Sequence, residues 1–332
     1  MQVSMRTIQA HASAKLILAG EHAVVYNRPA LAVPLPDVRA SVQITAGQSG
    51  SGCQLHMPDV HRSAHYGSDQ DPLLELVDDI LKAWHIANPD IIITVESDIP
   101  IASGMGSGAA VATAMVRACA LWFKHMQTTD QLAAMVFRSE QRLHGTPSGI
   151  DNTVIAYDQP IRFCRRPPAA DGSPQSAAID PLTLGAAFTI VIADTGVRSP
   201  THLAVAGVRS RRDADPAKYD ALFDAIGAAT AVAQMALTQG DAALLGMAAR
   251  QNQSFLQSIG VSTPLIDALV DAANGAGAYG TKISGAGVGG IIYAVVAPSR
   301  RDAVVVALRE AGARSVMPTT IAAYLPASAT TR

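Results

Sequence analysis

A cluster of glycine and serine residues at 102–110 has the composition of an anion-binding loop. The segment reads Ala-Ser-Gly-Met-Gly-Ser-Gly-Ala-Ala and stands between an expected strand and an expected helix. Glycine lets the backbone approach a ligand closely, and a helix N-terminus offers N–H groups without intrahelical partners. The segment therefore predicts a phosphate site that needs no lysine. The alternative is a glycine-rich turn in which Ser107 only caps the following helix.

Two acidic residues, Glu140 and Asp151, flank a turn segment that reads His-Gly-Thr-Pro-Ser-Gly over 144–149. Phosphoryl transfer from ATP requires magnesium, in-line positioning and a group that orients or deprotonates the acceptor hydroxyl. Magnesium prefers one or two carboxylates together with phosphate oxygens and water. One carboxylate could therefore hold the metal while the other faces the acceptor. The alternative is that both are surface charges, as most Asp and Glu residues are.

A lysine, Lys15, lies within the apolar run Ala-Lys-Leu-Ile-Leu over 14–18. A lysine on a buried strand needs a partner of opposite charge, because burying an isolated charge is costly. Asp151 is the candidate partner. The alternative is an edge strand whose lysine faces water and discourages pairing with other chains.

Other familiar nucleotide and metal motifs are missing or stand in the wrong context. No Gly-Lys dipeptide occurs, which excludes a Walker A loop. Residues 285–290 fit G-x-G-x-x-G, but the apolar run 291–296 that follows predicts a strand, whereas a dinucleotide fingerprint must open a helix. We therefore expect 285–290 to be a turn between two strands. The three cysteines lie far apart, so neither a disulfide framework nor a zinc cluster is indicated.

The pattern of apolar residues predicts strands and helices around these motifs. Strands are predicted within 6–36, including 23–26, and over 39–45, 91–95, 187–193, 281–284, 291–297 and 315–321. Helices are predicted from 72, after a cap at Asp71, and over 107–123, 130–143, 200–212, 214–238, 240–258, 263–276 and 300–311. Residues 46–70 are predicted to be a loop, and 167–180 a boundary between two α+β domains, 1–180 and 181–332.

The overall composition indicates a globular protein with a sizeable core. The chain has 332 residues, of which 49% are hydrophobic and 16% charged, with a formal net charge of -2. This balance gives no general attraction to nucleic acid or to a membrane surface. We see neither a signal peptide nor a continuous apolar run of the ~18 residues that span a bilayer. We therefore expect a cytoplasmic protein with no nucleic-acid or membrane partner.

Three separated segments resemble the motifs of the GHMP kinases. Residues 15–26 read KLILAGEHAVVY, close to K-V-I-L-x-G-E-H-x-V-V-Y; 100–110 are close to P-x-x-x-G-L-G-S-S-A-A; and 282–290 are close to K-L-T-G-A-G-G-G-G. Residues 140–152 and 193–201 are similar to segments of the mevalonate kinase branch of that family. Order and spacing hold over about 10–295.

The resemblance implies a two-domain GHMP kinase fold of the α+β class. Its N-terminal domain would be like the second domain of ribosomal protein S5, and its C-terminal domain ferredoxin-like. It further implies ATP- and Mg2+-dependent phosphorylation of the 5-hydroxyl of (R)-mevalonate, a small-molecule substrate. A homodimer is one candidate assembly.

The family's roles carry over to matching positions of this chain. Asp151 would act as base or orienting group, and Lys15 would pair with it and favour its ionised form. Glu140 and Ser107 would bind magnesium. The triphosphate of ATP would lie against Ala102, Ser103, Gly104, Met105, Gly106, Ser107, Gly108 and Ala109. The acceptor pocket would include Glu21, His22, Thr201 and Arg198, with Arg198 as candidate for the substrate carboxylate.

Departures from the family pattern keep alternatives open. Gly108 replaces a serine that often binds magnesium, Met105 replaces leucine, and Val288 interrupts the glycine run. Another acceptor, such as phosphomevalonate, a sugar or homoserine, is the first alternative. A non-catalytic ATP-binding relative is the second, kept open by Gly108. A decarboxylase is disfavoured, because Lys15 and Glu140 both fit the kinase pattern.

Overall fold

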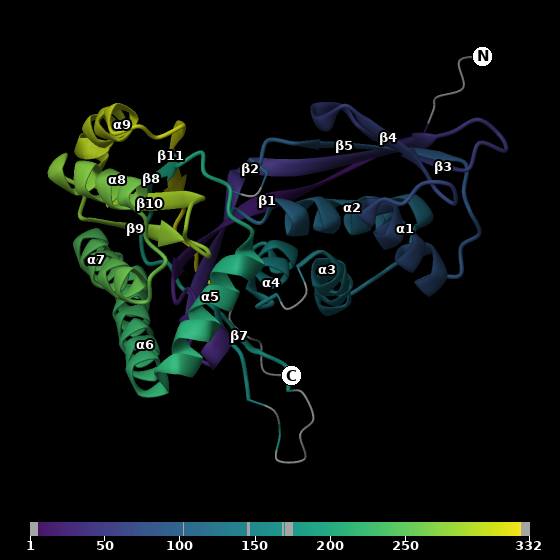
Figure 1. The fold of residues 1–332 in the computed structure, drawn as a ribbon. Helices are drawn as coiled ribbons and strands as arrows, with labels where there is room; N and C mark the ends of the chain where they lie inside the picture. Colours follow the sequence, from purple (N-terminus) through teal and green to yellow (C-terminus); the bar gives the residue numbers. More distant parts are fainter. Residues whose placement is uncertain (1–5, 102, 145–146, 168, 170–174, 327–332) are drawn as a thin grey trace. The chain divides into compact units, whose positions relative to one another are not determined.

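The computed structural model describes residues 6–101, 103–144, 147–167, 169 and 175–326 (Figure 1). The chain forms two compact units, each assembled from several segments. The first unit comprises Met1–Ala14, Leu35–Ile101 and Gly106–Asp158, and the second Lys15–Pro34, Ala102–Met105 and Gln159–Arg332. The expected domains 1–180 and 181–332 stay a prediction about the chain's organisation.

In the first unit, strands pair into a sheet with helices against it (Figure 1). The neighbours in the sheet are β4 (Arg62–His65), β3 (Cys53–Met57), β5 (Ile91–Ser97) and β2 (Ala30–Ala46). The short turn η2 (Pro58–Val60) links β3 and β4. The helices are α1 (Pro72–Ala83), α2 (Ser107–Phe123), α3 (Thr129–His144) and α4 (Ile150–Tyr157). The helices α2, α3 and α4 contact one another, which brings three of the predicted motifs together.

Local signals explain where these helices begin. Asp71 caps α1 by accepting a hydrogen bond of 2.8 Å from the Leu73 N–H, with Pro72 at the first helical position. Leu76, Val77 and Ile80 bury one face of this helix. No side chain caps α2, whose N-cap is Gly106 with a φ of 76°. Ser107 is therefore the first residue of α2, and its alternative role as the cap is wrong.

In the second unit, four antiparallel strands form a separate sheet. Their order is β11 (Ser315–Ile321), β8 (Phe188–Asp194), β10 (Ile291–Val296) and β9 (Gly280–Ser284). The helices of this unit are α5 (Thr201–Ala214), α6 (Pro216–Gln239), α7 (Ala242–Ser258), α8 (Pro264–Gly275) and α9 (Arg301–Glu310), which begins after η3 (Pro298–Arg300). Their apolar faces and the sheet enclose a core that includes Phe223, Ile226, Leu256 and Leu269. The α+β class is thus confirmed.

Two long strands, β1 (Thr7–Ala19) and β2, run from one unit into the other. In the second unit, the start of β2 pairs with β6 (Ile161–Cys164), which in turn pairs with β7 (Ala178–Pro181). Neither β6 nor β7 was predicted, because strands of four residues show too little alternation to detect. The helix α4 was also missed, since the glycine- and proline-rich turn before it masks its start.

Two further predictions about secondary structure were wrong. Residues 23–26 form a 3-10 helix, η1 (Ala23–Tyr26), instead of a strand, because an apolar run of four residues fits either conformation. Residues 46–70 contain β3 and β4 instead of only a loop. The run Cys53–Met57 does alternate, and the sheet buries Cys53, Leu55 and Met57. The glycine- and serine-rich residues before it favoured a loop instead.

One helix among the described residues, α6, is long and apolar enough to cross a membrane by length and composition alone. It contains Lys218, Asp220 and Asp224, so it is not a continuous apolar run. Tyr219, Phe223 and Ile226 on this helix belong to the core of the second unit. Part of its apolar surface is therefore packed inside the protein, and 39% of its apolar window is buried.

Candidate active site

In the first unit, the phosphate loop meets a buried carboxylate. Glu140 comes from α3 and is 7% exposed. A Cβ at Gly108 would lie 2.9 Å from Glu140 Oε1, so this carboxylate lies beside the first turn of α2. The room for it exists because residue 108 has no side chain. The structure thus brings together the predicted metal ligand Glu140 and the predicted phosphate-binding turn at Ser107 and Gly108.

These residues fit a magnesium ion whose other ligands come from a nucleotide. Among the described residues, no group of three or more His, Cys, Asp or Glu side chains could hold a metal by itself. Glu140 and the Ser107 hydroxyl, which is half-buried at the start of α2, supply hard oxygen donors. Magnesium commonly takes one or two protein oxygens and completes its octahedron with phosphate oxygens and water.

Asp151 lies in the first turn of α4, and its surroundings are well anchored. The next residue, Asn152, donates a hydrogen bond of 3.1 Å from Nδ2 to the Ala133 carbonyl on α3. Thr153 Oγ1 donates one of 2.6 Å to the Gly149 carbonyl. The Asn152 bond ties the start of α4 to α3, the helix that also carries Glu140, and the Thr153 bond closes the first turn of α4 itself. Asp151 itself is half-buried.

In the second unit, Lys15 lies next to the phosphate loop. It is 2% exposed, so the alternative of a solvent-facing edge lysine is wrong. Its backbone N–H donates a hydrogen bond of 3.0 Å to the Met105 carbonyl. Lys15 and Asp151 belong to different units, and their pairing stays a prediction.

The glycine turn 285–290 packs against the loop segment 103–105. It joins the antiparallel strands β9 and β10, which confirms that it is not a dinucleotide fingerprint. A Cβ at Gly290 would lie 2.8 Å from the Ser103 carbonyl oxygen, which explains the need for glycine there. Val288, where the family has glycine, adopts a φ of 62°, a region that β-branched residues rarely occupy. Ala102 lies outside the described residues.

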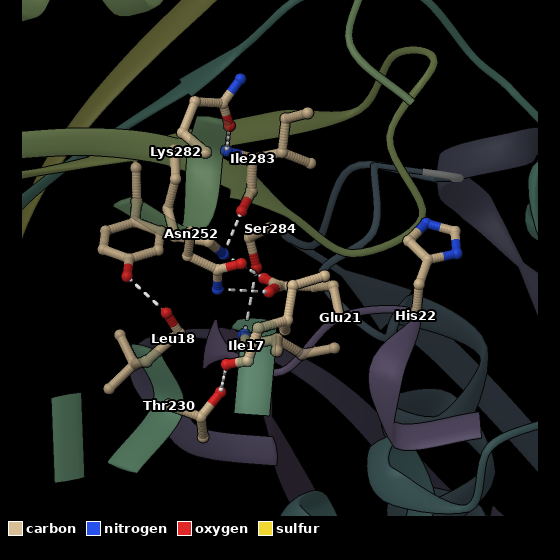
Figure 2. A network of polar contacts seen from close by, with 12 residues as sticks. Ile17, Leu18, Glu21, His22, Thr230, Asn252, Lys282, Ile283 and Ser284 are labelled. Atoms are coloured by element: carbon tan, nitrogen blue, oxygen red, sulfur yellow. Dashed lines mark hydrogen bonds and ion pairs between the residues drawn. The ribbon is translucent and has the colours of Figure 1, made fainter. Parts of the chain in front are cut away.

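Glu21 was expected in the acceptor pocket, but its carboxylate forms a buried ion pair with Lys282 (Figure 2). Asn252 Nδ2 also donates a hydrogen bond of 3.4 Å to Glu21 Oε2. Burial lowers the pKa of Lys282, while the charge of Glu21 opposes this shift. No local signal marks Lys282, because the strand Gly280–Ser284 reads GTKIS and is not apolar in sequence, although the fold buries all of it.

His22, also expected in the acceptor pocket, sits in a strained turn. Its φ and ψ are 59° and -48°, and the Ala23 N–H donates a hydrogen bond of 2.6 Å to the Glu21 carbonyl. Together these define a γ-turn with positive φ, which is rare. Such strain costs about 1–3 kcal/mol and persists only where surrounding contacts impose it.

The imidazole of His22 is neutral and has a defined tautomer. Its Nε2 lies 2.9 Å from the Ala286 carbonyl, which can only accept, so Nε2 carries the proton and Nδ1 is left as an acceptor. Burial lowers the pKa of His22 to about 4; the bond to Ala286 opposes this shift, and the charges of Arg211 and Lys282 add to it. His22 therefore offers a hydrogen-bond acceptor and no positive charge at neutral pH.

The other two expected pocket residues, Arg198 and Thr201, lie around the start of α5. The guanidinium of Arg198 donates two hydrogen bonds, of 2.8 and 2.7 Å, to the carboxylate of Asp194. Burial raises the pKa of Asp194, but the bonds from Arg198 and the Gly196 N–H outweigh it and lower the pKa overall. Arg198 is 32% exposed and keeps further N–H groups for a ligand. Thr201 is exposed as the first residue of α5.

Comparisons with known proteins agree with this arrangement. The family model described as GHMP kinases N terminal domain matches residues 73–159, and that described as GHMP kinases C terminal matches 233–314. The chain therefore belongs to the GHMP kinase family, and its α+β architecture is the two-domain fold of that family.

Relatives that match over nearly the whole chain are mevalonate kinases. That of Pyrococcus furiosus is 31% identical over 324 residues, covering 91% of this chain and 93% of the relative. That of Methanothermobacter thermautotrophicus is 32% identical, covering 90% and 93%. The structure of L. major mevalonate kinase in complex with R-mevalonate has a TM-score of 0.83 at 24% identity, covering 96% of this chain and 97% of that one.

Proposed function

We propose that this chain transfers the γ-phosphoryl group of ATP to the 5-hydroxyl of (R)-mevalonate. The observation that carries this proposal is the match to curated mevalonate kinases at 31% and 32% identity over nine-tenths of the chain. The buried Glu140 beside the N-terminus of α2 supports it, because a kinase needs an oxygen ligand for its metal next to the phosphate site.

In this mechanism, ATP is held by backbone N–H groups of residues 103–109. The N-terminus of α2 is open to an anion, since no side chain caps it. Glu140 and Ser107 would hold Mg2+, which neutralises charge on the phosphate oxygens when bound. Glu140 is already placed beside Gly108 by α3, so it needs no rearrangement to reach the phosphate loop.

Asp151 orients the 5-hydroxyl and accepts its proton as the new O–P bond forms. The bond between the γ-phosphorus and the ADP oxygen breaks in the same step, and ADP leaves. Lys15 pairs with Asp151 and stabilises charge that develops on the phosphoryl group. The acceptor is contacted by His22, Thr201 and Arg198, and Arg198 binds its carboxylate. Glu21 supports this pocket through its ion pair with Lys282. We also propose a cytoplasmic enzyme without nucleic-acid or membrane partners, with a homodimer as its assembly.

The first test is ADP release from Mg-ATP with mevalonate, phosphomevalonate, galactose and homoserine offered separately. Release with mevalonate alone is the expected result. Release with another member would leave the kinase chemistry and overturn the acceptor. No release with any of them, together with measurable ATP binding, would favour the non-catalytic alternative.

The second test is Asp151→Asn, which keeps the shape of the side chain and removes its basicity. We expect kcat to fall by about 10²–10⁴-fold, the usual contribution of a general base, with ATP binding retained. Asp158→Asn at the other end of α4 is the matched control, because the Asp158 carboxylate accepts a bond from the Ser13 hydroxyl and has no proposed role in the reaction. Wild-type turnover in Asp151→Asn would contradict the proposed role.

A further inference from the structure

Glu21 and Lys282 are separated by 261 positions in sequence and form an ion pair whose side chains are 1% and 0% exposed. Glu21 follows β1 directly, and Lys282 lies in β9. A pair this deeply buried is rarely needed for stability, since apolar residues of similar volume often serve as well. Its presence raises the question of what it positions.

Further hydrogen bonds hold the end of β1 to the hairpin formed by β9 and β10 (Figure 2). The Ile17 N–H donates a bond of 3.0 Å to Ser284 Oγ on β9. Tyr293 Oη on β10 donates one of 2.6 Å to the Leu18 carbonyl. The chain entering the turn at His22 is therefore held by side chains from both strands of the β9–β10 hairpin.

His22 is held from two sides by this hairpin. Its imidazole donates to the Ala286 carbonyl in the turn after β9. Its backbone γ-turn is closed onto Glu21, whose side chain is anchored by Lys282 on β9 itself. Ala286 thus contacts the ring of His22, and Lys282 contacts the side chain of the residue onto which the strained turn closes.

We propose that Lys282 is a positioning residue of the acceptor site: through Glu21 it holds the γ-turn that places the His22 ring against the Ala286 carbonyl, and this contact fixes the orientation and tautomer of the ring. The inference rests on the proposed function only in that His22 contacts the acceptor. It also changes the role of Glu21 from a pocket residue to the link between Lys282 and His22.

The experiment measures the imidazole ¹⁵N signals of His22 in histidine-labelled protein, assigned by their loss in His22→Asn. The variants are Lys282→Met, Glu21→Gln and the double change Glu21→Gln/Lys282→Met. Lys218→Met, which removes an exposed lysine from α6 of the same unit, is the control. Thermal unfolding and the KM values for mevalonate and ATP are measured on the same samples.

We expect wild type and Lys218→Met to show one neutral tautomer with Nε2 protonated. Each single variant should lose this signature, and its KM for mevalonate should rise about tenfold with KM for ATP unchanged. The double variant leaves no buried charge alone, so its unfolding midpoint should recover toward wild type while the His22 signature stays lost. Recovery of the unfolding midpoint without recovery of the His22 signature would separate a positioning role from a role in stability.

Two results would overturn the inference. One is a folded Lys282→Met protein with the wild-type His22 signature and KM values. The other is a double variant that recovers both the stability and the signature, which would give the pair a purely structural role. If Lys282→Met does not fold, the double variant decides. The ¹⁵N signals need no substrate, so they judge this inference even where ADP release contradicts the proposed acceptor.

Discussion

At the scale of single residues, burial of polar side chains is the main feature of this protein. Lys15, Glu21, His22, Glu140 and Lys282 are all nearly inaccessible to solvent. Burying such groups is costly unless each has a partner, so they mark places where the fold is constrained by something other than apolar packing. All five belong to segments that the family motifs identify.

The buried His22 predicts a pH dependence of stability. Its pKa is about 4 in the native state and about 6.5 when unfolded, so between these values the unfolded state binds a proton that the native state does not. The stability that His22 contributes is complete above pH 6.5 and is lost as pH falls toward 4. We expect its share of the loss to be about 2 kcal/mol between roughly pH 7.5 and pH 5.

Urea unfolding of wild type and His22→Asn at both pH values checks this prediction. The other histidines contribute equally to both proteins. The change in unfolding free energy between the two pH values therefore differs between the proteins only through His22. Asparagine tolerates a positive φ, which keeps the turn accessible in the variant. Equal changes in unfolding free energy for the two proteins would mean that His22 ionises in the native state as it does in the unfolded chain.

At the scale of elements, the contact between α2 and α3 explains how the chain tolerates glycine at 108. The family's serine would place its Cβ within 2.9 Å of Glu140 Oε1 as the two helices stand here. The carboxylate of Glu140 therefore occupies space beside the backbone that a side chain at 108 would need. The position of the Glu140 carboxylate in this structure therefore depends on glycine at 108.

Replacement of Gly108 should separate helix stability from metal binding. Gly108→Ala should gain up to about 1 kcal/mol in helix propensity, yet it displaces the Glu140 carboxylate. We expect the unfolding midpoint to stay or rise while Mn2+ binding, followed by electron paramagnetic resonance with a non-hydrolysable ATP analogue, weakens about tenfold, or ~1.4 kcal/mol. Gly108→Ser should also bind Mn2+ more weakly despite its hydroxyl. Tighter Mn2+ binding in Gly108→Ser would show that a side chain at 108 does not displace the Glu140 carboxylate.

At the scale of the whole molecule, neither compact unit is a single continuous stretch of the sequence. The segment 15–34 carries the first motif and belongs to the second unit, whose sheet and most helices come 150 or more positions later. Ala23 from this segment is part of the core formed by β8–β10 and α6–α9. Each unit is therefore incomplete without residues from distant parts of the chain.

A fragment that starts at the expected domain boundary should not fold by itself. Residues 181–332 lack Glu21, so Lys282 would be left buried without its ion-pair partner, which typically costs about 3–5 kcal/mol. We expect poor dispersion in its amide NMR spectrum and no cooperative unfolding. Adding a peptide of residues 15–34 would be expected to restore some structure, and a cooperatively folded fragment 181–332 would contradict the expectation.

The sequence by itself determined the family and most helices, because these depend on local motifs and local chemistry. Asp71 with Pro72, and Thr263 with Pro264, mark helix starts through caps that act within a few residues. The burial of Lys15 was also readable, since a lysine in an apolar strand needs a partner. The strands β3 and β4 were not predicted, because they are only five and four residues long and stand in a glycine- and serine-rich stretch. Their stability comes from pairing with each other and with β5.

Only the tertiary structure decided which buried charges meet. The sequence GTKIS of β9 does not show that Lys282 is buried. Its partner lies 261 positions away, and no local rule selects Glu21 over any other carboxylate. The same holds for the γ-turn at His22, whose positive φ is disfavoured locally and is maintained by contacts with β9 and the turn after it. Local free energies choose helices and caps, whereas strained turns and buried ion pairs exist because the packed fold compensates for their cost.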